Sequence, residues 1–361
     1  LSEGVAALLG MKAAVISLDS SDEDESTPPA KKICSQASSV DRTVGEVTGV
    51  PLYLNRLLDE DVAGPAQIEL SLQDIFERHP SNGLQLPREV LVANFMVDLG
   101  FLLDECPSLQ QVPRLTLMVG DDGRGCASAI RERKQRGLET RVHKPPLPLQ
   151  WGTHHSKLAL LLYDDCIRVC VRTFNDLFAD VHCKSQALYL QDFPTRLTAS
   201  GAEGGCSGDA DAFGADFQRH LTRYLQFCGG FDTGQLDRYD FSTAAAALVA
   251  SVPGYHTGPE IQEWGHMRLR HLLSRGDSLP EQWPGADAEE GLICQFSSLG
   301  SLSEKWLREI HASLLATAAP TAAPPGSALR PPLHLVAPTV SQVRDSGEGW
   351  VAGASIPIRS A

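Results

Sequence analysis

Two histidines and a lysine stand directly before an apolar run, in the stretch QWGTHHSK followed by LALLLY. In an extended segment, side chains two residues apart share a face, so His155 and Lys157 are predicted to project together while His154 points away. An ammonium neutralises phosphate oxygens, and an imidazole nitrogen can attack phosphorus to give a covalent phosphohistidine. The pair therefore suits phosphoryl chemistry, although a strand-end histidine beside a solvent-reaching lysine fits these residues as well.

An asparagine on the next predicted strand completes the candidate site. In VCVRTFN, the alternation of a strand places Val169, Val171, Thr173 and Asn175 on one face. We therefore expect Asn175 to bring an amide to the strand end near the histidine and lysine.

The elements that must position these residues have recognisable patterns. The segments 71–79 and 124–137 are predicted helices, the first after a serine cap and the second ending in glycine. Strands are predicted at 114–120, 156–164, 166–174 and 183–193, with Asp164-Asp165 as a hairpin turn that makes two of them antiparallel. This order predicts an α/β sandwich with a largely buried sheet.

Composition limits the class of protein. The chain has 361 residues, of which 42% are hydrophobic and 21% charged, which is enough for two domains with cores of their own. No apolar run approaches the roughly 20 residues that span a bilayer, so a soluble protein without a membrane partner is expected. The nine cysteines form no CxxC pair, which favours reduced intracellular thiols over disulfides or a structural metal.

The net charge of −14 is unevenly distributed. Between Arg114 and Lys157 there are nine Lys or Arg and only four acids, so the region that leads into the histidines is basic. The acidic total therefore does not exclude a nucleic-acid partner.

The first 47 residues are predicted to be a disordered, acidic, Ser-rich tail, because they contain few large apolar groups. Within it, Val15, Ile16 and Leu18 form a short strand-forming segment before an acidic serine block, which resembles a SUMO-interacting motif. A stray apolar tetrapeptide is the competing interpretation. The stretch PAKK is a weak nuclear signal.

Several spaced blocks together resemble the tyrosyl-DNA phosphodiesterases, a divergent family of the phospholipase D superfamily. The first is the long block from WGTHHSK to YLQDFP, and the others keep the family's order: PLYLNR, PRLTLMVG, LVASVPG, WGHMRLRHLL, QFSSLGSLSEKWL, PLHLVAPTVSQVR and EGWVAGASIP. The resemblance covers about residues 48 to 361. It implies a phospholipase D-like α-β-α sandwich.

The resemblance also implies an activity. Such an enzyme releases the tyrosine of stalled topoisomerase I, and related adducts, from DNA 3′ ends in the nucleus, through a phosphohistidine and without metal or cofactor. His155 matches the nucleophile, Lys157 the phosphate-binding lysine and Asn175 the motif asparagine. In the wider superfamily the His-x-Lys motif is followed, after four intervening residues, by an acid. This chain has Leu162 at that position, and the narrower family lacks the acid too.

Further site residues follow from the same resemblance. Trp151 matches an aromatic residue close to bound DNA, with Thr153 beside it, and base stacking is worth about 1–3 kcal/mol. Ser297 and Ser298 match a loop that touches backbone phosphates. Asp180 matches a family acid near the motif, and we expect it to orient a neighbour.

In this family a second His-x-Lys motif follows the last of these blocks, and the sequence given ends at Ala361 without one. The expected organisation is a complete N-terminal half at 48–230 and a partial C-terminal half at 231–361. The missing histidine would act as general acid and then as base, a role worth about 10²–10⁴ in rate. Two alternatives remain: a non-catalytic module that binds DNA ends or SUMO, and a one-motif phosphodiesterase completed by a second copy.

Overall fold

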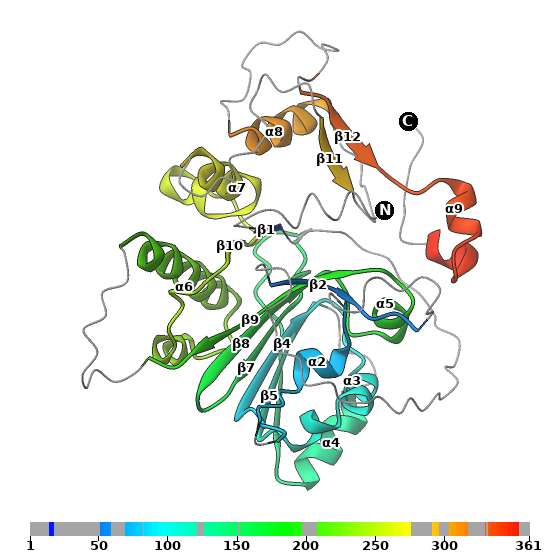
Figure 1. Cartoon of the computed structure of the whole chain (residues 1–361), viewed down its shortest axis with the longest axis vertical. Coiled ribbons are helices and arrows are strands. Elements are labelled where there is room, and N and C mark those ends of the chain that lie inside the picture. The colour runs from blue at the N-terminus through cyan, green and yellow to red at the C-terminus, as the bar shows by residue number, and fades with distance from the viewer. Residues whose placement is uncertain are drawn as a thin grey trace.

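The computed structural model describes residues 14–17, 51–58, 69–81, 83–120, 126–150, 152–196, 208–275, 291–295, 303–316, 329 and 331–353. Its centre is an eight-stranded sheet in the order β3-β2-β9-β8-β7-β4-β5-β6 (Figure 1). These strands are β2 (Leu52–Asn55), β3 (Glu69–Leu70), β4 (Glu89–Asn94), β5 (Arg114–Val119), β6 (Glu139–His143), β7 (Leu158–Leu162), β8 (Cys166–Arg172) and β9 (Ala187–Pro194).

The sheet is mixed. β4, β5 and β6 run parallel, while β7 pairs antiparallel with both β4 and β8, and β8 pairs antiparallel with β9. The predicted hairpin between β7 and β8 is therefore confirmed. Each of the four strands expected from the apolar runs is present, and the helix predicted after Ser71 is α2 (Leu72–Phe76), whose capping box joins Ser71 and Asp74.

Both faces of the sheet are buried, which gives three layers. On one face lie α2, α3 (Leu99–Glu105) and α4 (Cys126–Gln135), over a core that includes Val90 and Val92 of β4. On the other face lies the long α6 (Gly208–Cys228), over a core that includes Leu91 and Ala93. Alternate residues of one strand thus enter two separate cores, and this explains why β4 is apolar without alternation.

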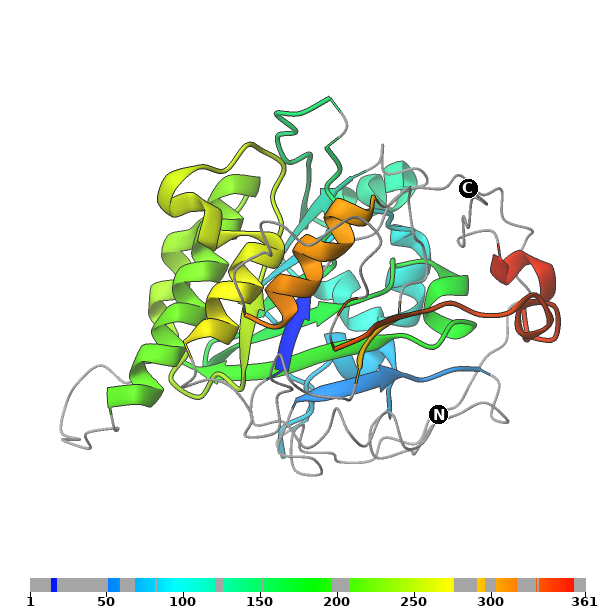
Figure 2. The same ribbon diagram turned by 90° about the horizontal axis from the view of Figure 1, so that it is seen from above.

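The chain continues beyond α6 into a second group of elements, which occupies the upper half of Figure 1. They are β10 (Ala246–Val249), α7 (Gly265–Ser274), β11 (Leu292–Gln295), α8 (Glu304–Leu314), β12 (Leu333–Val336) and α9 (Val340–Arg344). Ala246 and Leu248 of β10 join the α6-side core, and the alternate residues Ala247 and Val249 pack on leucines of α7. β11 and β12 form a separate parallel pair. Figure 2 shows the same arrangement from above.

The structure differs from the predicted disordered tail at four residues. Ala14–Ser17 form β1, which pairs in parallel with β10 (Figure 2). β-branched residues suit such pairing, and the edge of β10 offers backbone groups that need partners. The rest of the predicted tail, including Leu18, lies outside the described residues. The proposed boundary between two halves near residue 230 stays a prediction.

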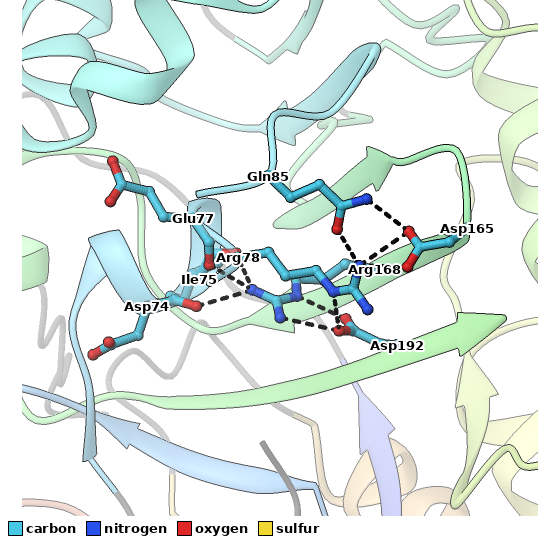
Figure 3. A network of polar contacts seen from close by, with 8 residues as sticks. All are labelled: Asp74, Ile75, Glu77, Arg78, Gln85, Asp165, Arg168 and Asp192. Atoms are coloured by element: carbon cyan, nitrogen blue, oxygen red, sulfur yellow. Dashed lines mark hydrogen bonds and ion pairs between the residues drawn. The ribbon is translucent and has the colours of Figure 1, made fainter. Parts of the chain in front are cut away.

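A buried arginine of β8, Arg168, connects this strand to α2. The short helix α5 (Phe178–His182) follows the other end of β8. Arg168 donates to both carboxylate oxygens of Asp192 on β9, at 2.7 and 3.0 Å, and to three carbonyls at the end of α2 (Figure 3). Arg78 joins Asp165 at the hairpin turn in the same network. This cluster fastens the α2 layer to the sheet.

Of the helices in the described ranges, none combines the length and apolar character that crossing a membrane requires.

Candidate active site

The candidate residues gather at one edge of the sheet because of strand register. Leu158, the first residue of β7, lies opposite Ala93 near the end of β4 and Val171 near the end of β8. The segments that follow β4, β5 and β8 therefore meet the segment that precedes β7. Four loops, distant in sequence, are brought to one place.

His155 and Lys157 are in direct contact there. β7 begins only at Leu158, so the pair lies in an irregular segment before the strand. Lys157 Nζ is 2.8 Å from His155 Nδ1 and also donates to the His155 carbonyl oxygen at 2.8 Å. An ammonium has no acceptor, so Nδ1 accepts this hydrogen bond. Lys157 is only 4% exposed, which rules out a lysine that merely reaches solvent.

The surroundings keep both histidines neutral. Burial, then the charge of Lys157 and the neighbouring His154, lower the pKa of His155 to about 4. Burial, then Lys157 and His143, lower the pKa of His154 to about 4. A neutral imidazole has one unprotonated nitrogen, which is what a nucleophile requires.

An aromatic ring and a glycine shape the space around His155. The rings of Phe95 and His155 have centroids 4.8 Å apart. Phe95 follows β4, and Gly120 follows β5. A Cβ on Gly120 would overlap the carbonyl oxygen of His154 and the ring of Phe95, so only glycine allows the three segments to approach this closely.

Asn175 and Asp180 form a second contact at this edge. β8 ends at Arg172, so Asn175 lies in the following loop rather than on the strand. Its Nδ2 donates to Asp180 Oδ2 at 2.9 Å, and its Oδ1 accepts from the backbone N–H of Met96 at 3.4 Å. Lys184 Nζ donates to the other carboxylate oxygen of Asp180 at 2.9 Å. The Asp180 charge also acts on His155, where it raises the pKa against the larger effects of burial and Lys157.

The other predicted site residues fall in two groups. Thr153 lines a cavity of about 30 Å³ beside His154 and His155, whose far wall includes Val252 and Pro253 from the segment after β10. The expected DNA contacts Trp151, Ser297 and Ser298 lie outside the described residues. The structure thus brings the segment LVASVPG against the histidine segment, as only a folded chain can.

Sequence reasoning missed five residues at this edge. Phe95 and Gly120 are two, and the buried Arg172, Asp176 and Asn94 behind them are the others. All but Asp176, which lies four residues beyond β8, stand at or directly after the end of an apolar strand, where a polar, aromatic or glycine residue interrupts the pattern. That position is the signal that would have found them.

The fold and the site define a phospholipase D-like α-β-α sandwich with a histidine–lysine pair at one sheet edge. Crystal structures of the yeast tyrosyl-DNA phosphodiesterase have this fold. A mutant form matches with a TM-score of 0.58 and the enzyme with no mutation named matches with a TM-score of 0.55, both at 17% identity. The first match covers 84% of this chain and 68% of the yeast chain. At that identity the likeness concerns the fold.

Sequence comparisons identify the family. The model of the tyrosyl-DNA phosphodiesterase family matches residues 52–361, and the chain belongs to that family. It is 37% identical to tyrosyl-DNA phosphodiesterase 1 of Arabidopsis thaliana over 74% of this chain and 43% of the relative. It is 31% identical to a probable tyrosyl-DNA phosphodiesterase of Caenorhabditis elegans over 92% of this chain and 69% of the relative. The chain thus spans less than half the length of the plant protein.

Proposed function

We propose that this chain supplies the nucleophile of a DNA repair phosphodiesterase that removes tyrosyl and related adducts from DNA 3′ ends. One observation carries the proposal: a neutral imidazole, His155, lies 2.8 Å from a buried ammonium, Lys157, where β4 and β8 end and β7 begins. A structural core has little use for this arrangement, because burying a lysine is costly. A phosphodiester anion suits it, because the ammonium meets its charge and the imidazole meets its phosphorus.

The chemistry follows from the contacts. In the resting site the Lys157 ammonium donates a hydrogen bond to the lone pair of His155 Nδ1. A phosphodiester that binds Lys157 competes for the same N–H groups and frees the imidazole for attack. The attack forms a P–N bond to His155 and breaks the P–O bond to tyrosine. The tyrosine leaves as a phenolate, whose phenol has a pKa near 10, and it takes a proton from water while the phosphorylated imidazole gives one up. Water then attacks phosphorus, the P–N bond breaks, and a 3′ phosphate is released.

Asn175 and Asp180 are proposed to hold the phosphate in place. The carboxylate of Asp180 fixes one N–H of the Asn175 amide, at 2.9 Å, so that the other N–H keeps a constant direction. Lys184 balances the charge of Asp180. An oriented amide beside an ammonium provides hydrogen bonds that do not need to reorganise during the reaction.

The activity is tested with a 5′-labelled, 3′-phosphotyrosyl oligonucleotide incubated with the purified full chain and with His155→Ala. The expected products are a gel-shifted covalent adduct and free 3′ phosphate, both lost in the variant. Sustained release shows turnover, and a stoichiometric adduct shows that the acid or base of the second step comes from elsewhere. No adduct and no product would refute the proposal.

We also propose that the site prefers single-stranded over duplex 3′ ends. The basic region before His155 and the aromatic Trp151 favour binding of a 3′ end as single strand, with duplex ends and exonuclease-like trimming as secondary uses. Fluorescence anisotropy with single- and double-stranded 3′ ends measures this. Trp151→Ala is expected to weaken single-strand binding about tenfold. Equal binding by that variant, or by Ser297→Ala/Ser298→Ala, would remove those residues from the interface.

The tail is proposed to direct the chain to nuclear SUMO-bearing partners through Val15, Ile16 and Leu18, with SUMO pairing along the edge of β1 that β10 does not occupy. The acidic serines after this segment suit a basic rim on such a partner. Calorimetric titration with SUMO checks it, and Ile16→Lys is expected to abolish the heat. A tagged chain that is excluded from nuclei would contradict the nuclear assignment.

A further inference from the structure

β8 carries two fully or nearly buried arginines on the same face, four residues apart. Arg168 lies within the strand and binds Asp192 on β9 (Figure 3). Arg172 ends the strand at the candidate site and binds Asp176, with Nη2 2.7 Å from Oδ2. Arg172 and Asp176 both have side chains with no exposed surface. The two pairs are therefore chemically alike and differ in which end of the sheet they serve.

The pair at the site end is poorly satisfied. Arg172 Nε and Nη1, together with Asp176 Oδ1, have no hydrogen-bond partner within the part of the chain that the structure describes. The Arg172 guanidinium instead lies over the rings of Phe76 and Phe174, 5.2 and 5.3 Å from their centroids. Burial raises the pKa of Asp176 against the opposing charge of Arg172. Stability alone is a weak reason for such a cluster, because apolar residues of similar volume often serve as well.

Asp176 connects three segments of the site. Asn94 at the end of β4 donates to the same Asp176 oxygen at 2.9 Å. The Asp176 backbone N–H donates to Met96 O at 3.2 Å, and its carbonyl accepts from the N–H of Asp98 at 3.0 Å. The loop of residues 94–98 and the loop of residues 173–176 are thereby joined by side chain and backbone.

The two joined loops carry the groups that flank His155. Phe95, between Asn94 and Met96, packs against the His155 ring. Asn175 precedes Asp176 directly. Arg172 is linked to the segment that carries His155 and Lys157, because its backbone N–H donates to Lys157 O at 3.0 Å. The charge of Lys157 also acts on Asp176.

We propose that Arg172, Asp176 and Asn94 form a buried positioning cluster that holds the Phe95 and Asn175 loops in the arrangement that lets His155 and Lys157 bind phosphate. These residues are positioning residues, since none contacts the reacting atoms. The inference rests on the proposed function, because it assumes that the His155 site takes a phosphate group.

The test uses the full chain with ¹⁵N-labelled histidine and inorganic phosphate as the probe. The phosphate-dependent shift of the His155 ring nitrogens gives an affinity, and thermal unfolding gives a stability for each variant. The site-end double variant is Arg172→Met/Asp176→Leu. Its matched control is Arg168→Met/Asp192→Leu, which replaces the other arginine–carboxylate pair of β8. Asp176→Asn, close to the parent in shape, covers the case in which the site-end double variant does not fold.

The positioning role predicts phosphate affinity at least tenfold weaker in the folded site-end variant, with the control within twofold of the parent whatever its melting temperature. A site-end variant that binds phosphate as the parent does would show that the cluster is only structural. A control that loses as much affinity as the site-end variant would also overturn the proposal. If the parent shows no phosphate-dependent shift at His155, the proposed function fails together with the inference.

Discussion

The network around Arg168 gives a stability prediction that can be worked through contact by contact. Arg168→Met removes a guanidinium whose side chain is 4% exposed. The substitution keeps much of the volume but removes every donor. The Asp192 carboxylate is then left with Arg78 alone, and the carbonyl oxygens of Asp74, Ile75 and Glu77 lose this donor (Figure 3).

The expected loss is about 3–6 kcal/mol. Breaking a buried ion pair costs about 3–5 kcal/mol, but Asp192 is 28% exposed and keeps Arg78 at 3.5 Å, so its share is about 2–3 kcal/mol. The buried Ile75 carbonyl adds about 1–3 kcal/mol, while the partly buried carbonyls of Asp74 and Glu77 can turn to water.

Urea unfolding followed by circular dichroism, in the parent and in Arg168→Met, measures this loss as a lower midpoint at unchanged slope. Arg168→Lys is expected to fall between them, because an ammonium cannot bind Asp192 with two parallel hydrogen bonds. Asp192→Asn is expected to cost about 1 kcal/mol, since the site is partly hydrated. A loss below 1 kcal/mol for Arg168→Met would refute the view that this guanidinium fastens α2 to the sheet.

Three further predictions concern the site and the pH dependence. Gly120→Ala is expected to reduce covalent adduct formation at least tenfold, because its Cβ displaces Phe95 or the His154 segment; a variant with full adduct yield would contradict the close approach. Asp180→Asn is expected to slow adduct formation about tenfold in single-turnover assays with little change in melting temperature, and an unchanged rate would count against its orienting role. His220 is buried on α6, where its Nε2 accepts from the Ala250 N–H. Burial lowers the pKa of His220 to about 3, so folded His220 stays neutral; its stabilising contribution is complete above pH 6.5 and falls by about 1.4 kcal/mol per pH unit below that value. Urea unfolding at pH 7.5 and 5.5 should therefore show a smaller pH difference in His220→Phe than in the parent, and equal differences would show that His220 is not the group concerned.

Much of the sheet could be predicted because its signal is local. Runs such as Leu158–Leu162 and Cys166–Arg172 are apolar and strand-sized, and a two-acid turn between them allows only a short hairpin. The exact start of β7 could not be predicted: the strand expected from Ser156 begins at Leu158, although the Arg172 N–H still donates to the Lys157 carbonyl oxygen.

The site residues likewise include contacts that local spacing predicts and contacts that it does not. The contact of His155 with Lys157 follows from a spacing of two residues in extended chain, and the structure has it at 2.8 Å. The prediction that Asn175 lies on the strand face was wrong, because the chain leaves the sheet at Arg172 and Asn175 turns to Asp180. A strand end is set by its neighbours, and periodicity does not report it.

The sequence by itself therefore determined the central strands, the contact of His155 with Lys157 and, through several spaced blocks, the family. The tertiary structure alone decided that Phe95, Gly120 and the Arg172–Asp176 pair meet at the His155 edge. These contacts depend on the register of β4, β5, β7 and β8, which lie far apart along the chain. Register is fixed when both faces of the sheet are buried at once, and that is a property of the whole folded domain rather than of any segment.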